Sequence, residues 1–178
     1  SFVVDGAGRN LTGYNALTFY AKASQGITGI TFGFGEGRYQ VITNDLDFST
    51  QWNKFIIPIP DPSKLIEERG MFLFSAGTQN TSGLGYTFWL DDVRFENLGT
   101  IAQPRPAIQN GLQENTDTFN GVDIQISGTT FTVNTESGDV TVLASPTYFS
   151  FNSENPSVAI VNELGSVSVL GEGSTEIT

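Results

Sequence analysis

Alternation of apolar and polar residues is the feature of this sequence that most constrains its fold. In ALTFYAKAS, residues 16–24, one face of the predicted strand is apolar and comprises Leu17, Phe19, Ala21 and Ala23. A period of two is typical of strands with one buried face, and no long segment shows the period of a helix. About seven such segments precede residue 98, each bounded by Gly, Asn, Asp or Pro. The chain is therefore predicted to be all-β, with its strands in a sandwich or jelly roll.

A proline pair and a change in composition divide the chain into two predicted domains. Pro104 and Pro106 lie in LGTIAQPRPAIQNG, and proline fixes φ and lacks a backbone donor, so an extended spacer is expected here. Both Trp and most of the Phe and Tyr precede residue 100, whereas Thr-, Val- and Ser-rich segments follow it. We predict one β-sandwich over 1–99, a linker over 100–107 and a second β-sandwich over 108–178.

The charge and the missing residue types exclude several functions. The net charge of −11 repels phosphate backbones, so no nucleic-acid partner is expected. Cys and His are both absent, which excludes thiol catalysis, Ser-His-Asp triads and imidazole-ligated metals. A bound metal would be a hard cation held by oxygen atoms, with calcium the leading candidate. No apolar run approaches the length of a transmembrane helix, so this segment is not expected to insert into a membrane.

The C-terminal sequence FSFNSENPSVAIVNELGSVSVLGEGSTEIT, residues 149–178, carries a recognisable motif. Asn155-Pro156 predicts a turn, Gly165 supplies a positive φ for a hairpin, and the predicted core-facing residues are Val158, Ile160, Val167 and Val169. The run resembles the bacterial Ig-like domain of the second group. The resemblance implies a spacer or adhesion module of an exported bacterial protein, with no chemistry of its own and a last strand truncated at Thr178.

Three segments of the first half form an ordered series, namely NLTGYNALTFYAKAS, KFIIPIPDPSK and YTFWLDDVRFENLG. The series resembles carbohydrate-binding modules of the galactose-binding-like, β-jelly-roll group, of the type attached to family 16 glycoside hydrolases of Bacteroidetes. The resemblance implies a jelly roll over 1–99 that lacks its first strands here. It also implies non-catalytic binding of a neutral polysaccharide at the cell surface or in secreted form, with a β-glucan such as laminarin as the first guess.

The paired aspartates Asp91 and Asp92 admit three interpretations: a metal site, a catalytic pair, or ordinary polar residues of a strand. Adjacent residues of a regular strand face opposite sides, so both can share one side only if a bulge intervenes. The resemblance implies a structural calcium, with Asp5 as the early acidic ligand. Catalysis by a glycosidase needs two carboxylates that face each other at about 5 to 10 Å. The family 16 signature Glu-x-Asp-x-x-Glu is absent, and we expect no enzymatic activity.

Glycan binding would use aromatic faces for the sugar rings and polar groups for the hydroxyls. The candidates are Trp52, Trp89, Tyr20, Tyr39 and Tyr86, with Arg38, Gln40, Asn44 and Gln79 as polar partners. Each of these aromatic residues could instead be buried in the hydrophobic core. The position of Trp52 before an apolar strand favours the core, whereas that of Trp89 favours neither.

Two other functions remain open. The chain could be the targeting region of a polysaccharide hydrolase whose catalytic domain lies outside this sequence, or a structural or adhesion protein without a glycan ligand. The first hypothesis is a surface glycan-binding protein for polysaccharide utilization, near a surface transporter or a hydrolase.

Overall fold

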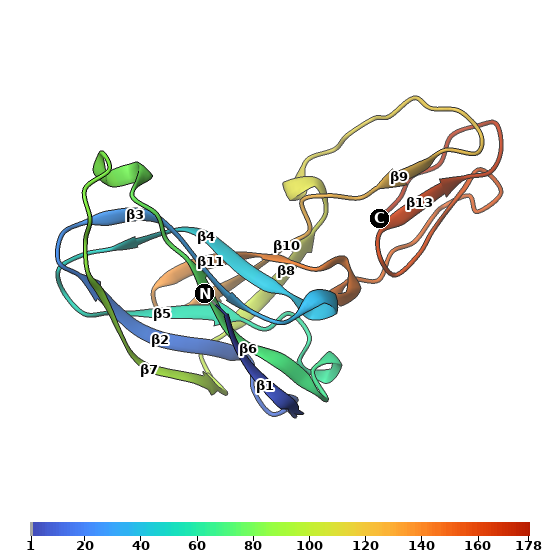
Figure 1. The fold of residues 1–178 in the computed structure, drawn as a ribbon. Coiled ribbons are helices and arrows are strands. Elements are labelled where there is room, and N and C mark those ends of the chain that lie inside the picture. Colours follow the sequence, from blue (N-terminus) through green and yellow to red (C-terminus); the bar gives the residue numbers. More distant parts are fainter. Residues whose placement is uncertain (1) are drawn as a thin grey trace.

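The computed structural model describes residues 2–178, and this part of the chain is all-β, as predicted. It contains a β-sandwich region followed by a smaller sheet (Figure 1). The strands are β1 (Phe2–Arg9), β2 (Ala16–Ala23), β3 (Ile27–Phe34), β4 (Val41–Phe48), β5 (Asn53–Pro58), β6 (Glu68–Ser75), β7 (Phe88–Glu96), β8 (Ala102–Ala107), β9 (Asp123–Gln125), β10 (Thr130–Thr135), β11 (Gly138–Ala144), β12 (Ala159–Val161) and β13 (Ser166–Val169).

The helical elements within residues 2–178 are five single 3-10 turns, and none is long enough to cross a membrane. They are η1 (Gly37–Tyr39), η2 (Pro62–Lys64), η3 (Gln79–Thr81), η4 (Gln109–Gly111) and η5 (Pro146–Tyr148).

Two antiparallel sheets form the sandwich. The larger has the strand order β1-β6-β3-β4-β11-β10-β8, and the smaller has the order β5-β2-β7 (Figure 1). Strand β2 shows the predicted alternation: Leu17 and Phe19 are fully buried, whereas Tyr20 is exposed. The inner face of the three-stranded sheet therefore builds the core, and its outer face is exposed at Tyr20, whereas Thr18 on the same face is buried.

Stacked phenylalanines dominate this core. The rings of Phe19 and Phe32 lie 4.7 Å apart at their centroids, which joins β2 to β3 across the two sheets. The ring of Phe32 has further aromatic neighbours in Phe48, Phe72 and Phe74. Such offset ring contacts add to the burial of apolar area and hold the two sheets in a fixed relation.

The segment that was expected to be a spacer is a strand of the larger sheet. Strand β8 pairs with β10, and β11 pairs with β4 through the partners Leu143–Ile42 and Ala144–Val41. Proline is tolerated here because β8 is the last strand of its sheet, where a missing donor breaks no inner ladder. The sheet thus continues across residues 100–107, and the proposed division into domains 1–99 and 108–178 stays a prediction.

The smaller C-terminal sheet has the order β12-β13-β9 and a core of Ile126, Ala159 and Val167. Of the residues predicted to face this core, Val158 and Val167 are buried and Val169 is half-buried. The prediction for Ile160 is wrong, since its side chain is 46% exposed. The two residues that flank it in β12 pack on the core, so the alternation of the strand turns Ile160 outward.

The predicted turns of this region are present. The side-chain oxygen of Asn155 accepts hydrogen bonds from the backbone N–H and the hydroxyl of Ser157, at 3.2 and 2.7 Å. Gly165 has a φ of 74°, as the hairpin requires. The local sequence is therefore sufficient to predict these turns.

Candidate functional site

The candidate site is the outer face of the sheet β5-β2-β7, where the strand register aligns side chains in rows. Tyr20 of β2 is paired with Lys54 on one side and with Asp91 on the other. Lys22 is paired with Trp89, and Trp52 directly precedes β5 on the opposite side. Because side chains of a strand alternate between its faces, these residues all belong to the solvent side.

Two tryptophans and a lysine form the first of these rows. The Nζ atom of Lys22 lies 4.9 Å from the ring centroid of Trp52 and 5.3 Å from that of Trp89. A cation over an aromatic face is attracted by the ring quadrupole, so Lys22 interacts favourably with both indoles. Trp52 and Trp89 are each 44% exposed, and Tyr20 in the adjacent row is 37% exposed.

The core position that the sequence favoured for Trp52 is therefore wrong. In β5 the buried side chains include Ile57, and Phe55 packs against the same core. Trp52 has the parity of Lys54, which lies on the outer face. The alternation of β5 thus assigns Trp52 to the solvent side, although an apolar strand follows it.

A bulge in β7 brings both aspartates to this face. Thr18 is paired with Arg94 while Tyr20 is paired with Asp91, so β7 has one residue more than β2 in this interval. Asp92 adopts a φ of 52°, and its backbone N–H donates to Oδ1 of Asp91 at 2.8 Å. An extra residue in the left-handed region is the usual signature of a bulge. Both carboxylates consequently line one open pocket, of about 410 Å³, with Tyr20 and Trp52.

Next to this pocket, ion pairs and hydrogen bonds hold Glu96. Its Oε1 accepts from Thr18 Oγ1 at 2.7 Å and from Arg94 Nε at 2.5 Å, and its Oε2 lies 3.5 Å from Lys54 Nζ. The hydrogen bond from Thr18 and then that from Arg94 lower the pKa of the Glu96 carboxyl. The hydrogen bond to Glu96 also raises the pKa of Arg94. Positive and negative charges thus largely balance on this part of the face.

The three predicted metal ligands do not converge. Asp5 lies on β1, in the larger sheet, where it binds Arg9 Nε at 2.8 Å and the backbone N–H of Ala7 at 3.1 Å. These bonds, the one from Arg9 first, lower the pKa of Asp5. Residues 2–178 contain no group of three or more acidic side chains placed to hold a metal. The expected set of Asp5 with Asp91 or Asp92 is thus not assembled, and calcium binding stays a prediction. An unchanged melting temperature in EDTA would argue against it.

Three predicted ligand-binding residues, Arg38, Tyr39 and Gln40, lie elsewhere, at the contact with the C-terminal region. The hydroxyl of Tyr148 donates to the Tyr39 carbonyl at 3.0 Å, and their rings lie 5.5 Å apart. The backbone N–H of Gln40 donates to the Ser145 hydroxyl at 3.1 Å. Burial raises the pKa of the Tyr148 phenol. Residues 38–40 therefore pack against the C-terminal region, and the structure does not place them beside Trp52 and Trp89.

The other candidates are also separate from this face. The hydroxyl of Tyr86 donates to the Gly77 carbonyl at 2.8 Å, and its ring packs against the main core. Asn44 lies on β4, where it accepts from Thr31 at 3.0 Å, and Gln79 lies in η3. Lys22, by contrast, was missed. Its parity with Tyr20 in the alternating strand β2 was the signal that could have identified it.

The buried carboxylate of Glu68 has a structural explanation. Its Oε1 accepts hydrogen bonds from the backbone N–H groups of Glu36, Arg69 and Gly70, at 3.0, 2.9 and 2.7 Å. Three donors to one oxygen satisfy a buried carboxylate and fix the start of β6. A general acid or base would instead face a substrate pocket. The expected lack of catalysis stays a prediction.

The fold and this face define an all-β sandwich with an exposed aromatic surface. In comparisons with known proteins, residues 127–178 match the model of a family described as "Intimin, immunoglobulin-like domain". The C-terminal segment is therefore an intimin-type Ig-like domain, a type typical of surface-exposed bacterial proteins, and an all-β sandwich region precedes it. The match covers less than half of the chain. No curated protein and no solved structure matches the chain.

Proposed function

We propose that the outer face of β5-β2-β7 binds a glycan without catalysis, in a protein at the bacterial cell surface or in secreted form. One observation carries the proposal: Trp52, Tyr20 and Trp89, from neighbouring strand positions, are exposed together on one face. Sugar rings present apolar C–H surfaces that stack on such rings, and hydroxyls find hydrogen-bonding partners in Asp91 and Asp92 at the pocket beside them.

A neutral polysaccharide suits this surface best. The net charge of −11 repels polyanionic glycans at long range. Around the pocket, the side chains of Lys54 and Arg94 are paired with Glu96, and Arg94 also lies 3.3 Å from Asp92. A β-glucan such as laminarin is the first candidate, on the resemblance of the N-terminal region to carbohydrate-binding modules.

The Ig-like match favours one other role, that of a structural or adhesion protein in which the sandwich has no glycan ligand. The proposed face would work equally in a binding protein beside a transporter or in the targeting region of a polysaccharide hydrolase. A glycan-binding test separates both of these from the adhesion role.

The test is affinity electrophoresis against a panel of neutral polysaccharides, followed by calorimetry with those that retard the protein. Trp52→Ala and Trp89→Ala should each weaken binding by about tenfold or more, as is usual for central aromatic anchors. Phe119→Ala is the matched control, because Phe119 is 83% exposed and belongs to the C-terminal half. Lack of retardation on every neutral glycan would contradict the proposal and favour the adhesion role.

A further inference from the structure

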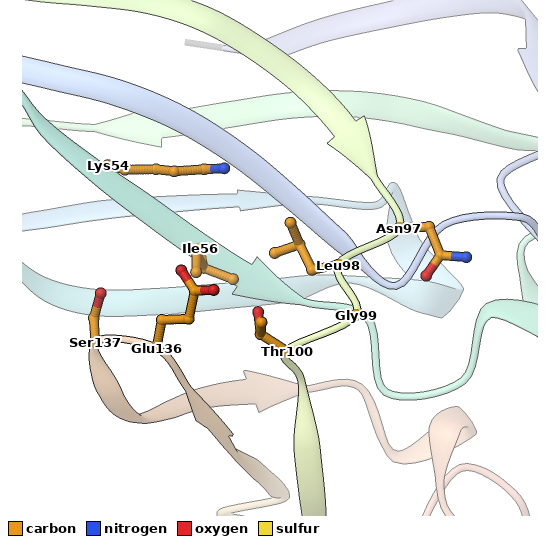
Figure 2. A pocket seen from close by; sticks show the side chains of 8 residues that line it. All are labelled: Lys54, Ile56, Asn97, Leu98, Gly99, Thr100, Glu136 and Ser137. Carbon is orange, nitrogen blue, oxygen red and sulfur yellow. The ribbon is translucent and has the colours of Figure 1, made fainter.

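A second pocket, of about 390 Å³, lies where three segments of the chain meet (Figure 2). Strand β5 contributes Lys54 and Ile56, the loop after β7 contributes residues 97–100, and the turn between β10 and β11 contributes Glu136 and Ser137. Figure 2 shows Glu136 and Thr100 rising toward Ile56 from the two chain segments below β5. The volume lies within the usual range of small-molecule sites.

This pocket continues the aromatic face. Lys54 belongs to the row of Tyr20 and Asp91, and Ile56 is paired with Thr18 in the row that follows. From Trp52 to Ile56 strand β5 advances four residues, which is about 13 Å at the rise of a β-strand. This distance exceeds one sugar ring. The two surfaces together therefore suit an extended chain of several sugar units.

The lining combines apolar and polar groups in the manner of a sugar subsite. Ile56 and Leu98 are half-buried and provide apolar surface, while Thr100, Glu136 and Ser137 offer hydroxyl and carboxylate oxygens. No ion pair within residues 2–178 involves Glu136, whereas Lys54 is paired with Glu96. The carboxylate of Glu136 is therefore free to accept hydrogen bonds from sugar hydroxyls.

The turn that carries Glu136 is held in a fixed position. The Thr135 hydroxyl donates to the Gly138 carbonyl at 2.8 Å, and the Ser137 backbone N–H donates to the Thr135 hydroxyl at 3.2 Å. At the base of the turn, Arg105 of β8 pairs with Asp139 at 2.5 Å. Such a preformed turn loses little conformational entropy when a ligand binds.

We propose that this pocket is an end subsite for an oligosaccharide that also covers the aromatic face. The inference rests on the proposed function and extends it in two respects. The ligand is a chain of several sugar units, and the C-terminal half contributes directly to binding through Glu136 and Ser137. A fragment that ends before β10 would lack this subsite even if its aromatic face were intact.

The experiment measures the affinity of the full chain for laminarin oligosaccharides, from the disaccharide to the hexasaccharide, by calorimetry. Affinity should rise with length and then level off. Glu136→Ala should lower the affinity for the hexasaccharide about fivefold to tenfold, the effect of one lost hydrogen bond of ordinary strength, and leave the disaccharide unaffected. Glu114→Ala removes the same charge from an exposed position outside the pocket and should change neither affinity. Ser137→Ala, a milder change on the same turn, should act in the direction of Glu136→Ala.

Three outcomes are distinguishable. Loss of affinity for long ligands alone supports the subsite. Equal affinity of the native chain for short and long ligands, or an unchanged hexasaccharide affinity in Glu136→Ala, overturns the subsite and leaves the aromatic face standing. Absence of binding at any length contradicts the proposed function, and the subsite with it. Circular dichroism and melting temperature, expected to be unchanged in Glu136→Ala, show whether the variant is folded.

Discussion

The sandwich and the C-terminal sheet follow the same alternating pattern, yet they differ sharply in the core that the pattern builds. The main cluster includes nineteen buried residues, four of which come from β10 and β11: Phe131, Val133, Val142 and Ala144. The cluster of the C-terminal sheet has three buried residues, Ile126, Ala159 and Val167. The hairpin β10–β11 belongs to the segment that matches the Ig-like family, but it packs into the sandwich. Similar β patterning thus builds cores of very different size, and we expect the region with the larger core to be the more stable one.

The largest effect is expected at the centre of the sandwich. Phe32 is fully buried and contacts the rings of Phe19, Phe48, Phe72 and Phe74. Phe32→Ala should lower the free energy of unfolding by about 3–5 kcal/mol, because it removes these contacts and leaves a cavity. Denaturant unfolding followed by circular dichroism measures the change. Ile160→Ala, at an exposed position of the C-terminal sheet, should cost well under half as much, and equal losses would contradict the burial pattern on which the comparison rests.

The next effect tests whether the two regions share one core. Val133 of β10 is fully buried in the main cluster, whereas Val167 of β13 lies in the small one. Val133→Ala should cost about 2–3 kcal/mol, since it removes two buried methyl groups and leaves a cavity. Both tryptophans lie in the sandwich, so their fluorescence follows the unfolding of that region.

The expected pattern is specific to the position of each valine. Val133→Ala should lower the denaturant midpoint of the fluorescence transition, and Val167→Ala should leave it nearly unchanged. If Val133→Ala leaves that transition in place, the hairpin does not stabilise the sandwich. The chain would then divide near residues 100–107, as the sequence predicts.

The fold class could be predicted from the sequence because alternation is a local property. The seven strands of the first region and the buried face of β2 follow from it. The pairing of β8 with β10 and of β11 with β4 could not be predicted from the sequence, because it depends on the register between distant segments. Pro104 and Pro106 are compatible both with a spacer and with an edge strand, and only pairing distinguishes the two.

The candidate site was predicted in part, for the same reason. Trp52, Trp89 and Tyr20 were among the candidates, and strand parity places them on one face. Tyr39 was also a candidate, and it is half-buried against Tyr148, a residue 109 positions away. No local pattern reports which surface segment a distant part of the chain will cover. The sequence also could not predict whether β7 has a bulge at Asp92. A single extra residue in a strand leaves the alternation on either side of it intact.

A smaller effect is expected from Glu96, whose hydrogen bonds and ion pairs connect the three strands on the outer face of the sheet β5-β2-β7. Its pKa in the folded protein is lowered from 4.5, chiefly by the hydrogen bond from Thr18 and then by that from Arg94. The stability that Glu96 contributes is therefore fully present above pH 4.5 and is lost as the pH falls through the lower, folded value. Glu96→Gln should cost about 1 kcal/mol at neutral pH, the order of one hydrogen bond of ordinary strength, and should flatten the acid limb of the stability profile.

Urea unfolding at a series of pH values measures that profile. Glu176→Gln, at an exposed position near the C-terminus, is the control and should leave the profile unchanged. If the stability profile of Glu96→Gln parallels that of the native protein through the acid limb as well, the Glu96 carboxyl does not have a lowered pKa.

The smallest effect is expected at the charged contact between the two regions. Arg38 Nη2 lies 2.8 Å from Glu163 Oε1, but the two side chains are 54% and 67% exposed. Exposed pairs are solvated and screened by salt, and they must immobilise two long side chains, so most contribute less than about 1 kcal/mol. The less exposed contacts beside the pair, including the part-buried hydrogen bond from the Tyr148 hydroxyl to the Tyr39 carbonyl, should contribute more to joining the two regions. A double-mutant cycle of Arg38→Ala and Glu163→Ala should thus give a coupling energy below about 0.5 kcal/mol that disappears in high salt. Tyr148→Phe removes a part-buried hydrogen bond and leaves the Tyr39 carbonyl without this donor, and it should cost more than either charge variant. If the ion pair proved the stronger of the two, the regions would be joined mainly by surface charge and could separate as the salt concentration rises.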